Sequence, residues 1–439
     1  MLKKMSFTLL IVFILLTPIS INAKILLSSV SVNDGKTEET TAISGDIFEK
    51  GGGYIHPLII VEGGYTDNVF NTNEDKTGDY HITVSPEIWL AFPGSEKRWA
   101  NLFTSSKTPA GHIFTRSNPS TLRQFQAYLS GRANITRYHE NTDQNTDTYD
   151  IQGRFLYNAK GGLSLDLIDD YKLTFDPIST GAATLNDEGK YRSNLFDAIL
   201  TYDVTEKTKL RLGYSNFDLD YDNSTLTSNN RNDNAYSGYV YYTISPKTSF
   251  FVNLDFIDIH YEQDSTSDST ELDAYGGIDW RATSKTAGYF KSGYGVKNFS
   301  DDSDKVENLI LEGSVSYIFS PKVTFGLRAS QRMDESQIDG MDYTLTRDLQ
   351  GTYQHQITDA MKFNLMLGYA NSDFYGRMIY NNVTYERDDE LYRISPSLNY
   401  QIMDWLAAIL AYDFSMRDSN IPDFNFKTNT SSLRISASL

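Results

Sequence analysis

Hydrophobic and polar residues alternate along most of the chain from residue 54 onward, in stretches that are separated by two kinds of connection. Six connections are short turns, and they fall at 204–207, 244–247, 282–285, 319–322, 357–360 and 402–405. Polar loops rich in Asp, Asn and Ser lie between them. The short turns recur about every 40 residues, which corresponds to two strands of about a dozen residues with two unequal connections. This rhythm predicts antiparallel strands with short turns at one end and long loops at the other.

The alternation predicts about 18 strands, an even number as in single-chain bacterial membrane barrels. We expect them near 54–66, 79–92, 122–138, 147–158, 162–175, 191–203, 208–220, 234–244, 248–261, 271–282, 286–299, 306–319, 322–334, 343–357, 361–374, 386–402, 405–417 and 428–439.

Each predicted strand has one apolar and one polar face. In 322–332, for example, Val323, Phe325 and Leu327 share one face, whereas Thr324 and Arg328 share the other. The chain offers many such apolar faces and few helices to cover them, so lipid is the simplest cover. Strands of about 10 residues with a tilt of about 40° span roughly 25 Å, the height of the apolar band of an outer-membrane barrel. The predicted fold is therefore an all-β, transmembrane, antiparallel up-and-down β-barrel with a polar lumen.

Composition narrows the class of protein further. Aromatic residues make up 13% of the chain, with 30 Tyr, which suits the membrane–water girdles of a barrel. The mean hydropathy is −0.42, and no stretch after residue 23 is apolar for about 20 residues, which excludes an α-helical membrane protein. The absence of cysteine excludes disulfides and a lipoprotein anchor. A net charge of −18 without a basic stripe argues against nucleic-acid binding.

The N-terminus resembles a secretory signal peptide. Lys3 and Lys4 precede an apolar stretch from Phe7 to Leu16 that is too short to span a bilayer, and Ala23 is the expected last residue removed. An uncleaved membrane anchor is the alternative. The predicted organisation is thus a signal peptide at 1–23, a periplasmic N-terminal leader at 24–53 and an outer-membrane barrel at 54–439. Within the barrel, 93–121 is expected to be a long periplasmic insertion.

Charged and aromatic residues on the predicted polar faces are the candidate functional residues. The lumen-lining candidates are Arg132, Arg154, Arg211, Arg281, Arg328, Arg393, Arg434, Glu87, Glu312, Asp279, Tyr128, Tyr239 and Tyr241. The charges either form cross-strand ion pairs that stiffen the wall, or form a charged constriction that selects solutes. The tyrosines offer stacking surfaces to sugar rings.

No catalytic or metal-binding arrangement is evident. The six histidines are scattered and lack metal-ligand spacing. Ser117 and Ser120 lie near His112 in sequence, but on the predicted periplasmic insertion rather than at the outer rim. We therefore expect neither an enzyme nor a bound metal or cofactor.

Two motifs carry a family resemblance. The segment from Val61 to Phe70, followed by Thr83–Glu87, resembles the opening of the bacterial "putative β-barrel porin 2" family. The pattern from Tyr392 to Tyr400, with Asp404–Leu406 and Tyr412–Ser419, resembles that family's closing hairpin. The resemblance covers about residues 54–439 and implies an outer-membrane barrel of a kind often associated with exopolysaccharide or capsule export.

These observations predict a multi-pass barrel in the outer membrane, in contact with lipid and lipopolysaccharide. The resemblance implies that it passes a polar polymer as the barrel component of an exopolysaccharide export system, with a periplasmic polysaccharide-export protein as partner. A passive general porin for small polar solutes is the alternative, and a structural or adhesive surface barrel is a third.

Overall fold

The computed structural model describes residues 53–94, 124–175, 189–224, 226–263, 267–280, 283–300, 305–336, 338 and 341–438. Their main elements are strands: β1 (Ile55–Thr66), β2 (Asp79–Phe92), β3 (Phe125–Tyr138), β4 (Thr146–Asn158), β5 (Leu163–Phe175), β6 (Lys190–Asp203), β7 (Thr208–Tyr221), β8 (Arg231–Ser245), β9 (Thr248–Tyr261), β10 (Ser269–Trp280), β11 (Thr286–Phe299), β12 (Val306–Ser320), β13 (Val323–Glu335), β14 (Met341–Thr358), β15 (Met361–Gly376), β16 (Met378–Tyr380), β17 (Val383–Tyr385), β18 (Asp388–Met403), β19 (Leu406–Ser419) and β20 (Phe426–Ser438). Three short 3-10 helices lie in the loops: η2 (Thr142–Gln144), η4 (Thr227–Asn229) and η5 (Pro422–Phe424).

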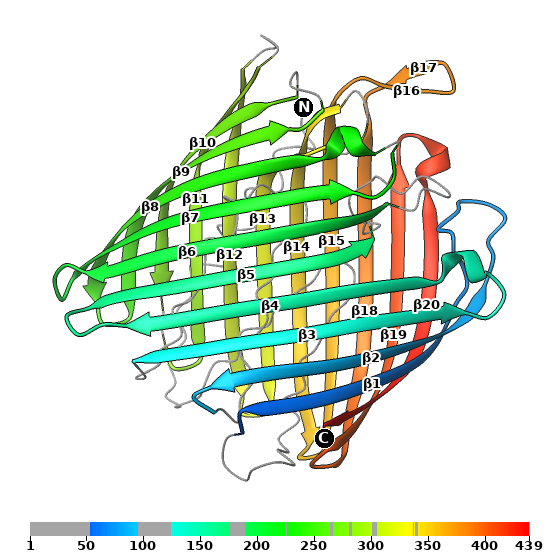
Figure 1. Cartoon of the computed structure of the whole chain (residues 1–439), viewed down its shortest axis with the longest axis horizontal. Helices are drawn as coiled ribbons and strands as arrows, with labels where there is room; N and C mark the ends of the chain where they lie inside the picture. Colours follow the sequence, from blue (N-terminus) through cyan, green and yellow to red (C-terminus); the bar gives the residue numbers. More distant parts are fainter. Residues whose placement is uncertain are drawn as a thin grey trace.

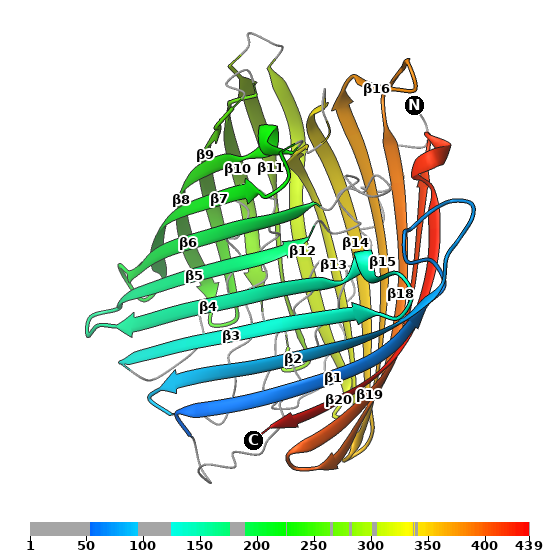
Figure 2. The ribbon, with the colours of Figure 1, turned by 45° about the vertical axis from the view of Figure 1, so that its right-hand side comes forward.

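The strands form a closed barrel. Eighteen of the described strands pair antiparallel with their neighbours in chain order, and β16 and β17 form a separate two-stranded ribbon in the loop between β15 and β18. The sheet closes because β1 also pairs with β20, from Leu58↔Ser438 to Thr66↔Thr430. In Figures 1 and 2 the strands of the near wall cross those of the far wall at a steep angle, as tilted barrel strands must. The predicted fold class is confirmed.

The predicted strand positions agree closely with the structure. The ranges 79–92, 248–261 and 286–299 match β2, β9 and β11. The β16–β17 ribbon was not predicted, because two strands of three residues each are too short to show alternation. The signal peptide, the leader up to residue 52 and residues 95–121 of the insertion lie outside the described residues.

Hydroxyl groups stabilise four of the six predicted short turns, at Thr205, Ser245, Thr283 and Ser320. Thr205 Oγ1 accepts hydrogen bonds from the backbone N–H groups of Lys207 (3.2 Å) and Thr208 (2.9 Å). Thr283 Oγ1 does the same for Lys285 and Thr286, both at 3.0 Å. A Ser or Thr before a two-residue tip therefore satisfies backbone donors that the strand ladder leaves open. This arrangement accounts for the Ser or Thr that recurs at these four turns.

The outer face of the barrel is apolar and exposed. In β9, Phe250, Val252 and Leu254 point outward with 47%, 60% and 60% of their surface exposed, whereas Phe251 and Asn253 between them are buried. Burial of these outward side chains needs an apolar surrounding, which the hydrocarbon core of a bilayer supplies.

Aromatic rings border this outer surface at both ends. Tyr65 and Tyr80 pair across β1 and β2 at 4.9 Å toward the long loops, and Phe92 and Phe125 pair across β2 and β3 at 5.6 Å toward the short turns. Such rings suit the two membrane–water interfaces.

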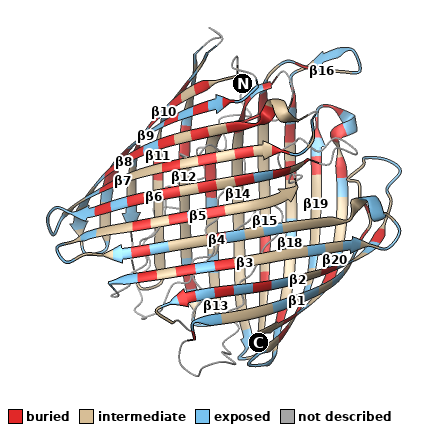
Figure 3. Cartoon of the chain, viewed as in Figure 1, coloured by how far each residue is buried: buried red, intermediate tan, exposed pale blue. Residues whose placement is uncertain are grey.

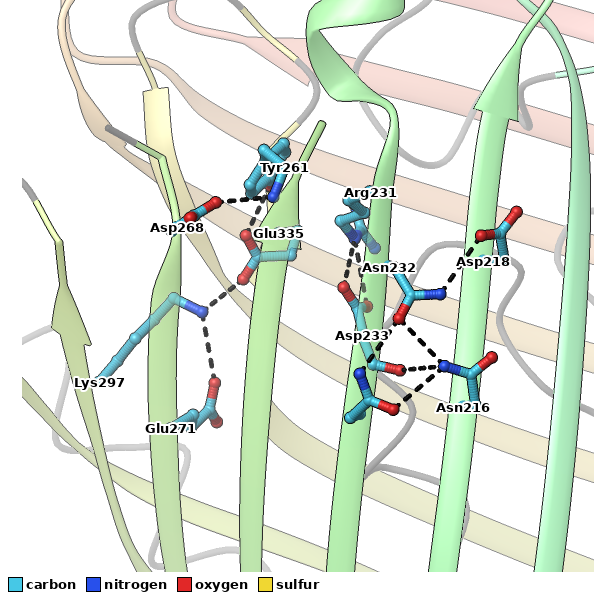
Figure 4. A network of polar contacts seen from close by, with 11 residues as sticks. Asn216, Asp218, Arg231, Asn232, Asp233, Tyr261, Asp268, Glu271, Lys297 and Glu335 are labelled. Carbon is cyan, nitrogen blue, oxygen red and sulfur yellow. Dashed lines mark hydrogen bonds and ion pairs between the residues drawn. The ribbon is translucent and has the colours of Figure 1, made fainter. Parts of the chain in front are cut away.

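On the long-loop side of the aromatic rings, the outward positions of β7 and β8 are occupied by polar side chains. Asn216 Nδ2 donates to the side-chain oxygens of Asn232 and Asn234, both at 3.1 Å, and Asn232 Nδ2 donates to Asp218 at 3.3 Å (Figure 4). An amide ladder of this kind is costly in hydrocarbon. This part of the wall therefore stands in water, above the membrane on the long-loop side.

Among the described residues, no helix is long and apolar enough to cross a bilayer.

Candidate functional site

The inner face of the barrel carries the predicted candidate residues. Because side chains alternate along each strand and the register shifts only near some strand ends, the inward positions can be followed from strand to strand. The following predicted residues occupy inward positions: Arg132, Arg154, Arg211, Arg328, Arg393, Arg434, Glu87, Glu312, Asp279, Tyr128, Tyr239 and Tyr241. Arg281 lies outside the described residues.

Most of the inward arginines form ion pairs with neighbouring strands. Arg132 on β3 binds Glu87 directly opposite on β2, with Nε and Oε2 at 2.8 Å. Arg434 on β20 binds Glu62 on β1 with the same Nε–Oε2 distance of 2.8 Å. Planar guanidinium groups that donate two hydrogen bonds to one carboxylate are geometrically well defined. These pairs therefore fix the spacing of the strands that they join, including the closing pair of strands.

Arg154 and Arg211 are engaged in two different ways. Arg154 donates from Nε and Nη2 to the two oxygens of Asp166, at 2.8 and 2.7 Å. Arg211 lies over the rings of Tyr239 and Tyr241, with the guanidinium carbon 5.8 and 5.3 Å from the ring centroids. The second arrangement is a cation–π contact, which a search for opposite charges along the sequence does not find.

Glu312 on β12 interacts with side chains from two neighbouring strands. Arg328 reaches it from β13 at 3.4 Å, Lys291 from β11 at 3.5 Å, and the Tyr289 hydroxyl donates to its Oε1. Lys291 and Lys297 were not among the predicted lumen residues. The alternation in the sequence would have identified them, because both lie at odd positions of 286–299, on the same face as Tyr289.

A buried charge network joins the lumen side of β9, β10 and β11 to β13 near the long loops (Figure 4). Lys297 on β11 forms ion pairs with Glu335 on β13 and, at 3.6 Å, with Glu271 on β10. Tyr261 on β9 donates its hydroxyl to Glu335 at 2.6 Å. These side chains are almost entirely buried. Charges so far from water are retained only when they are paired, so this network fixes the relative positions of four strands.

Glu335 reaches this network because the tips of β13 and β14 lie inside the barrel wall. The strands β12 and β13 pair only from Ser320↔Val323 up to Leu311↔Gln331, and above this point each pairs with its other neighbour alone. Alternation along β13 puts Met333 and Glu335 on its outward face, yet Met333 lies against Gly295 on the inner face of β11. The inner surface of β9–β12 therefore covers the outward surface of the β13–β14 tip.

The two sides of the lumen differ in packing (Figure 3). On β6–β9 the inward positions toward the long loops are mostly large and apolar, and they form one buried cluster with members such as Leu195, Phe217, Ile257 and Ile259. On β14–β20 the inward positions are mainly small and polar. Between Thr346 and Gln356 on β14, and between Tyr392 and Leu398 on β18, no residue is buried. Within the described residues, the more accessible side of the lumen is thus the wall formed by β14–β20, above all β14 and β18, although inward residues such as Asn364, Ile409 and Ser436 are buried.

The predicted aromatic residues are less accessible than sugar stacking requires. Tyr128 and Tyr239 are buried, with 6% and 2% of their surface exposed, and Tyr128 packs with Trp89 and Ala91. Tyr241 is partly buried against the β6–β9 cluster. Neighbouring side chains occupy the ring faces of these tyrosines. No group of three or more His, Asp or Glu side chains in the described part of the chain has an arrangement that could hold a metal ion.

Comparison with solved structures finds other barrels. A BenF-like porin from Pseudomonas fluorescens Pf-5 gives a TM-score of 0.44 at 8% identity, covering 88% of this chain and 99% of that one. Pseudomonas aeruginosa OccK2 (OpdF), in complex with glucuronate, gives 0.45 at 10% identity, covering 88% and 100%. OprD from the same organism gives 0.42 at 11% identity, covering 88% and 96%. At these scores the likeness carries no argument about mechanism or solute.

The sequence comparisons identify the family. No curated protein matches the chain. A family model described as "Putative beta-barrel porin 2" matches residues 116–438. The match begins after the opening motif at Val61–Phe70, and it includes the closing hairpin with Tyr392–Tyr400. Together with the closed barrel and its apolar outer band, this match shows that the chain is an outer-membrane β-barrel that belongs to the "putative β-barrel porin 2" family.

Proposed function

We propose that the protein is a passive pore for small polar solutes. The observation that carries this proposal is the polar wall of β14–β20, where Thr346, Gln350, Thr352 and Gln354 on β14 and Ser395 and Ser397 on β18 face the lumen without being buried. Small hydroxyl and amide groups can exchange hydrogen bonds with water and with a passing solute without holding either one tightly. A barrel of 18 strands is wide enough to leave an aqueous passage when side chains do not fill it.

The same geometry favours small solutes over a polymer. The apolar cluster on β6–β9 and the inward tip of β13–β14 take up part of the cross-section toward the long loops. The prediction of exopolysaccharide export rests on the family resemblance, and the family match names a porin without naming a polymer. We therefore place the passive pore, the alternative of the sequence analysis, ahead of polymer export.

The test uses purified protein in liposomes that contain lipopolysaccharide. We expect the initial influx rate of neutral sugars to fall steeply from monosaccharide to trisaccharide, as in a narrow water-filled passage. In the native organism, deletion of the gene should slow the uptake of small sugars and leave surface polysaccharide unchanged. Loss of surface polysaccharide with normal sugar uptake would instead support the export function.

A further inference from the structure

We infer that the accessible wall contains a binding site for the carboxylate group of a small anionic solute, formed by Arg393, Gly368 and Gln350. This inference rests on the proposed pore function and adds the solute class. The three residues occupy one row across adjacent strands, since Gln350 on β14 lies opposite Gly368 on β15, which lies opposite Arg393 on β18. All three occupy lumen-facing positions, and none of them is buried.

Among the residues that the structure describes, Arg393 differs from the other predicted arginines in having no partner. Of the six that the structure describes, five are engaged with a carboxylate or with tyrosine rings, namely Arg132, Arg154, Arg211, Arg328 and Arg434. Within the described part of the chain, the Arg393 guanidinium forms no ion pair, hydrogen bond or ring contact. Its cross-strand neighbours are Gly368 and Ser415, and neither can neutralise a charge.

Gly368 leaves a hollow beside this guanidinium. A Cβ atom placed on Gly368 would meet only the Cβ of Arg393 within 4 Å, at 3.5 Å, which is ordinary contact. On the other side of the hollow is Gln350, whose side-chain amide has no hydrogen-bond partner in the described structure. Adjacent strands are about 4.8 Å apart, so Gln350 and Arg393 flank a space about 10 Å wide between their Cα atoms. Both side chains are long enough to reach into it.

These groups match the chemistry of a small carboxylate. The planar guanidinium can donate two parallel hydrogen bonds to the two oxygens of a carboxylate. The Gln350 amide can donate to the solute and can also accept a hydrogen bond from a hydroxyl group. A second cation, Lys362, which has no partner among the described residues, lies on the same wall toward the short-turn end, in register with Asn399. An anion that leaves the site in this direction therefore meets a second positive charge.

The experiment compares labelled gluconate with sorbitol, which has nearly the same skeleton without the carboxylate. Influx into liposomes is measured for the wild-type chain, Arg393→Gln, Gly368→Leu and Arg434→Gln. Arg434→Gln is the matched control, since it also removes one positive charge from the accessible wall, but one that is paired with Glu62. Assembly of each variant is checked by the faster migration of unboiled barrel on a gel.

We expect Arg393→Gln to lower the gluconate-to-sorbitol ratio about tenfold, the effect of losing one charge-assisted pair. Gly368→Leu should lower the ratio similarly while leaving the reversal potential in a KCl gradient unchanged, because it fills the hollow and keeps the charge. Arg434→Gln should change the ratio less than twofold, because the Arg434 charge is already compensated by Glu62 and is not available to a passing anion.

An equal effect of Arg393→Gln and Arg434→Gln would overturn the site, because general lumen charge would then explain the preference. An unchanged gluconate-to-sorbitol ratio in assembled Arg393→Gln or Gly368→Leu would also overturn the proposed site. If sorbitol still enters in that case, the pore function would stand without the site. If the assembled wild-type barrel passes neither solute, the pore function fails and the site fails with it.

Discussion

Tyr261 on β9 donates its hydroxyl to Glu335 on β13 at 2.6 Å, although three strands separate β9 from β13 in the sheet. The contact exists because the β13–β14 tip lies inside the wall of β9–β12. Lys297 binds the same carboxylate, so the position of the tip depends on one buried acid.

Removing the positive partner of this acid should destabilise the barrel. Lys297→Met leaves Glu271 and Glu335 buried without their cation, and breaking such a pair typically costs about 3–5 kcal/mol. Unfolding in urea, followed by tryptophan fluorescence in detergent, measures the change. The matched control is Lys305→Met, which removes an exposed pair with Glu307 and should cost less than about 1 kcal/mol. Equal stability of the two variants would contradict the structural role of the network.

The same substitution at two successive positions of β19 tests the assignment of the faces. Leu410 is 58% exposed on the outer face, in a row with Leu398 and Leu433, so Leu410→Arg places a charge in lipid and should cost about 2–4 kcal/mol or prevent assembly. Ala411→Arg points into the lumen between Ser397 and Ser432 and should assemble normally. Membrane fractionation with a heat-modifiability gel distinguishes them. A reversed result would show that inside and outside are exchanged.

The close approach of β10 and β11 requires glycine at position 293. A Cβ atom there would lie 1.8 Å from the backbone oxygen of Ala274, so Gly293→Ala forces the two strands apart and should cost about 1–3 kcal/mol. At Gly276 a Cβ atom meets nothing within 4 Å, so Gly276→Ala should change the free energy of unfolding by less than about 0.5 kcal/mol. Urea midpoints of both variants measure the difference, and similar midpoints would argue against the tight strand contact.

Export by a cleaved signal peptide stays a prediction from the sequence. We expect N-terminal sequencing of protein from the outer membrane to begin at Lys24, directly after Ala23. A sequence that begins at Met1 in membrane-inserted protein would favour the uncleaved anchor.

Much of the fold was predictable because it depends on a local pattern. The alternation through Phe250, Val252 and Leu254 identifies both the strand and its lipid face, and at several turns a Ser or Thr such as Thr205 marks where a strand ends. The inward position of Arg393 followed from the same alternation, but its lack of a partner within the described part of the chain did not. Partners depend on which residues lie opposite across the strands, and a single strand does not reveal its register.

The inward tip of β13 was not predictable for a different reason. Alternation from Arg328 onward assigns Glu335 to the lipid side, and only the end of pairing at Leu311↔Gln331 brings it to the inner surface of β9–β12. Whether two neighbouring strands separate near their ends is decided by packing across the barrel, which no pattern within one strand records.

The pairing of β1 with β20 also has a consequence for biogenesis. Arg434 and Glu62 are 372 residues apart in the chain, so the last ladder forms between two of the most distant strands in sequence. Contacts of such long range form slowly, because the intervening chain must first be ordered. Until then the growing sheet has two free edges, and free edges pair readily with other chains. A nascent or truncated chain that lacks β20 therefore keeps an edge that the mature barrel has lost, and this edge distinguishes incomplete molecules from finished ones.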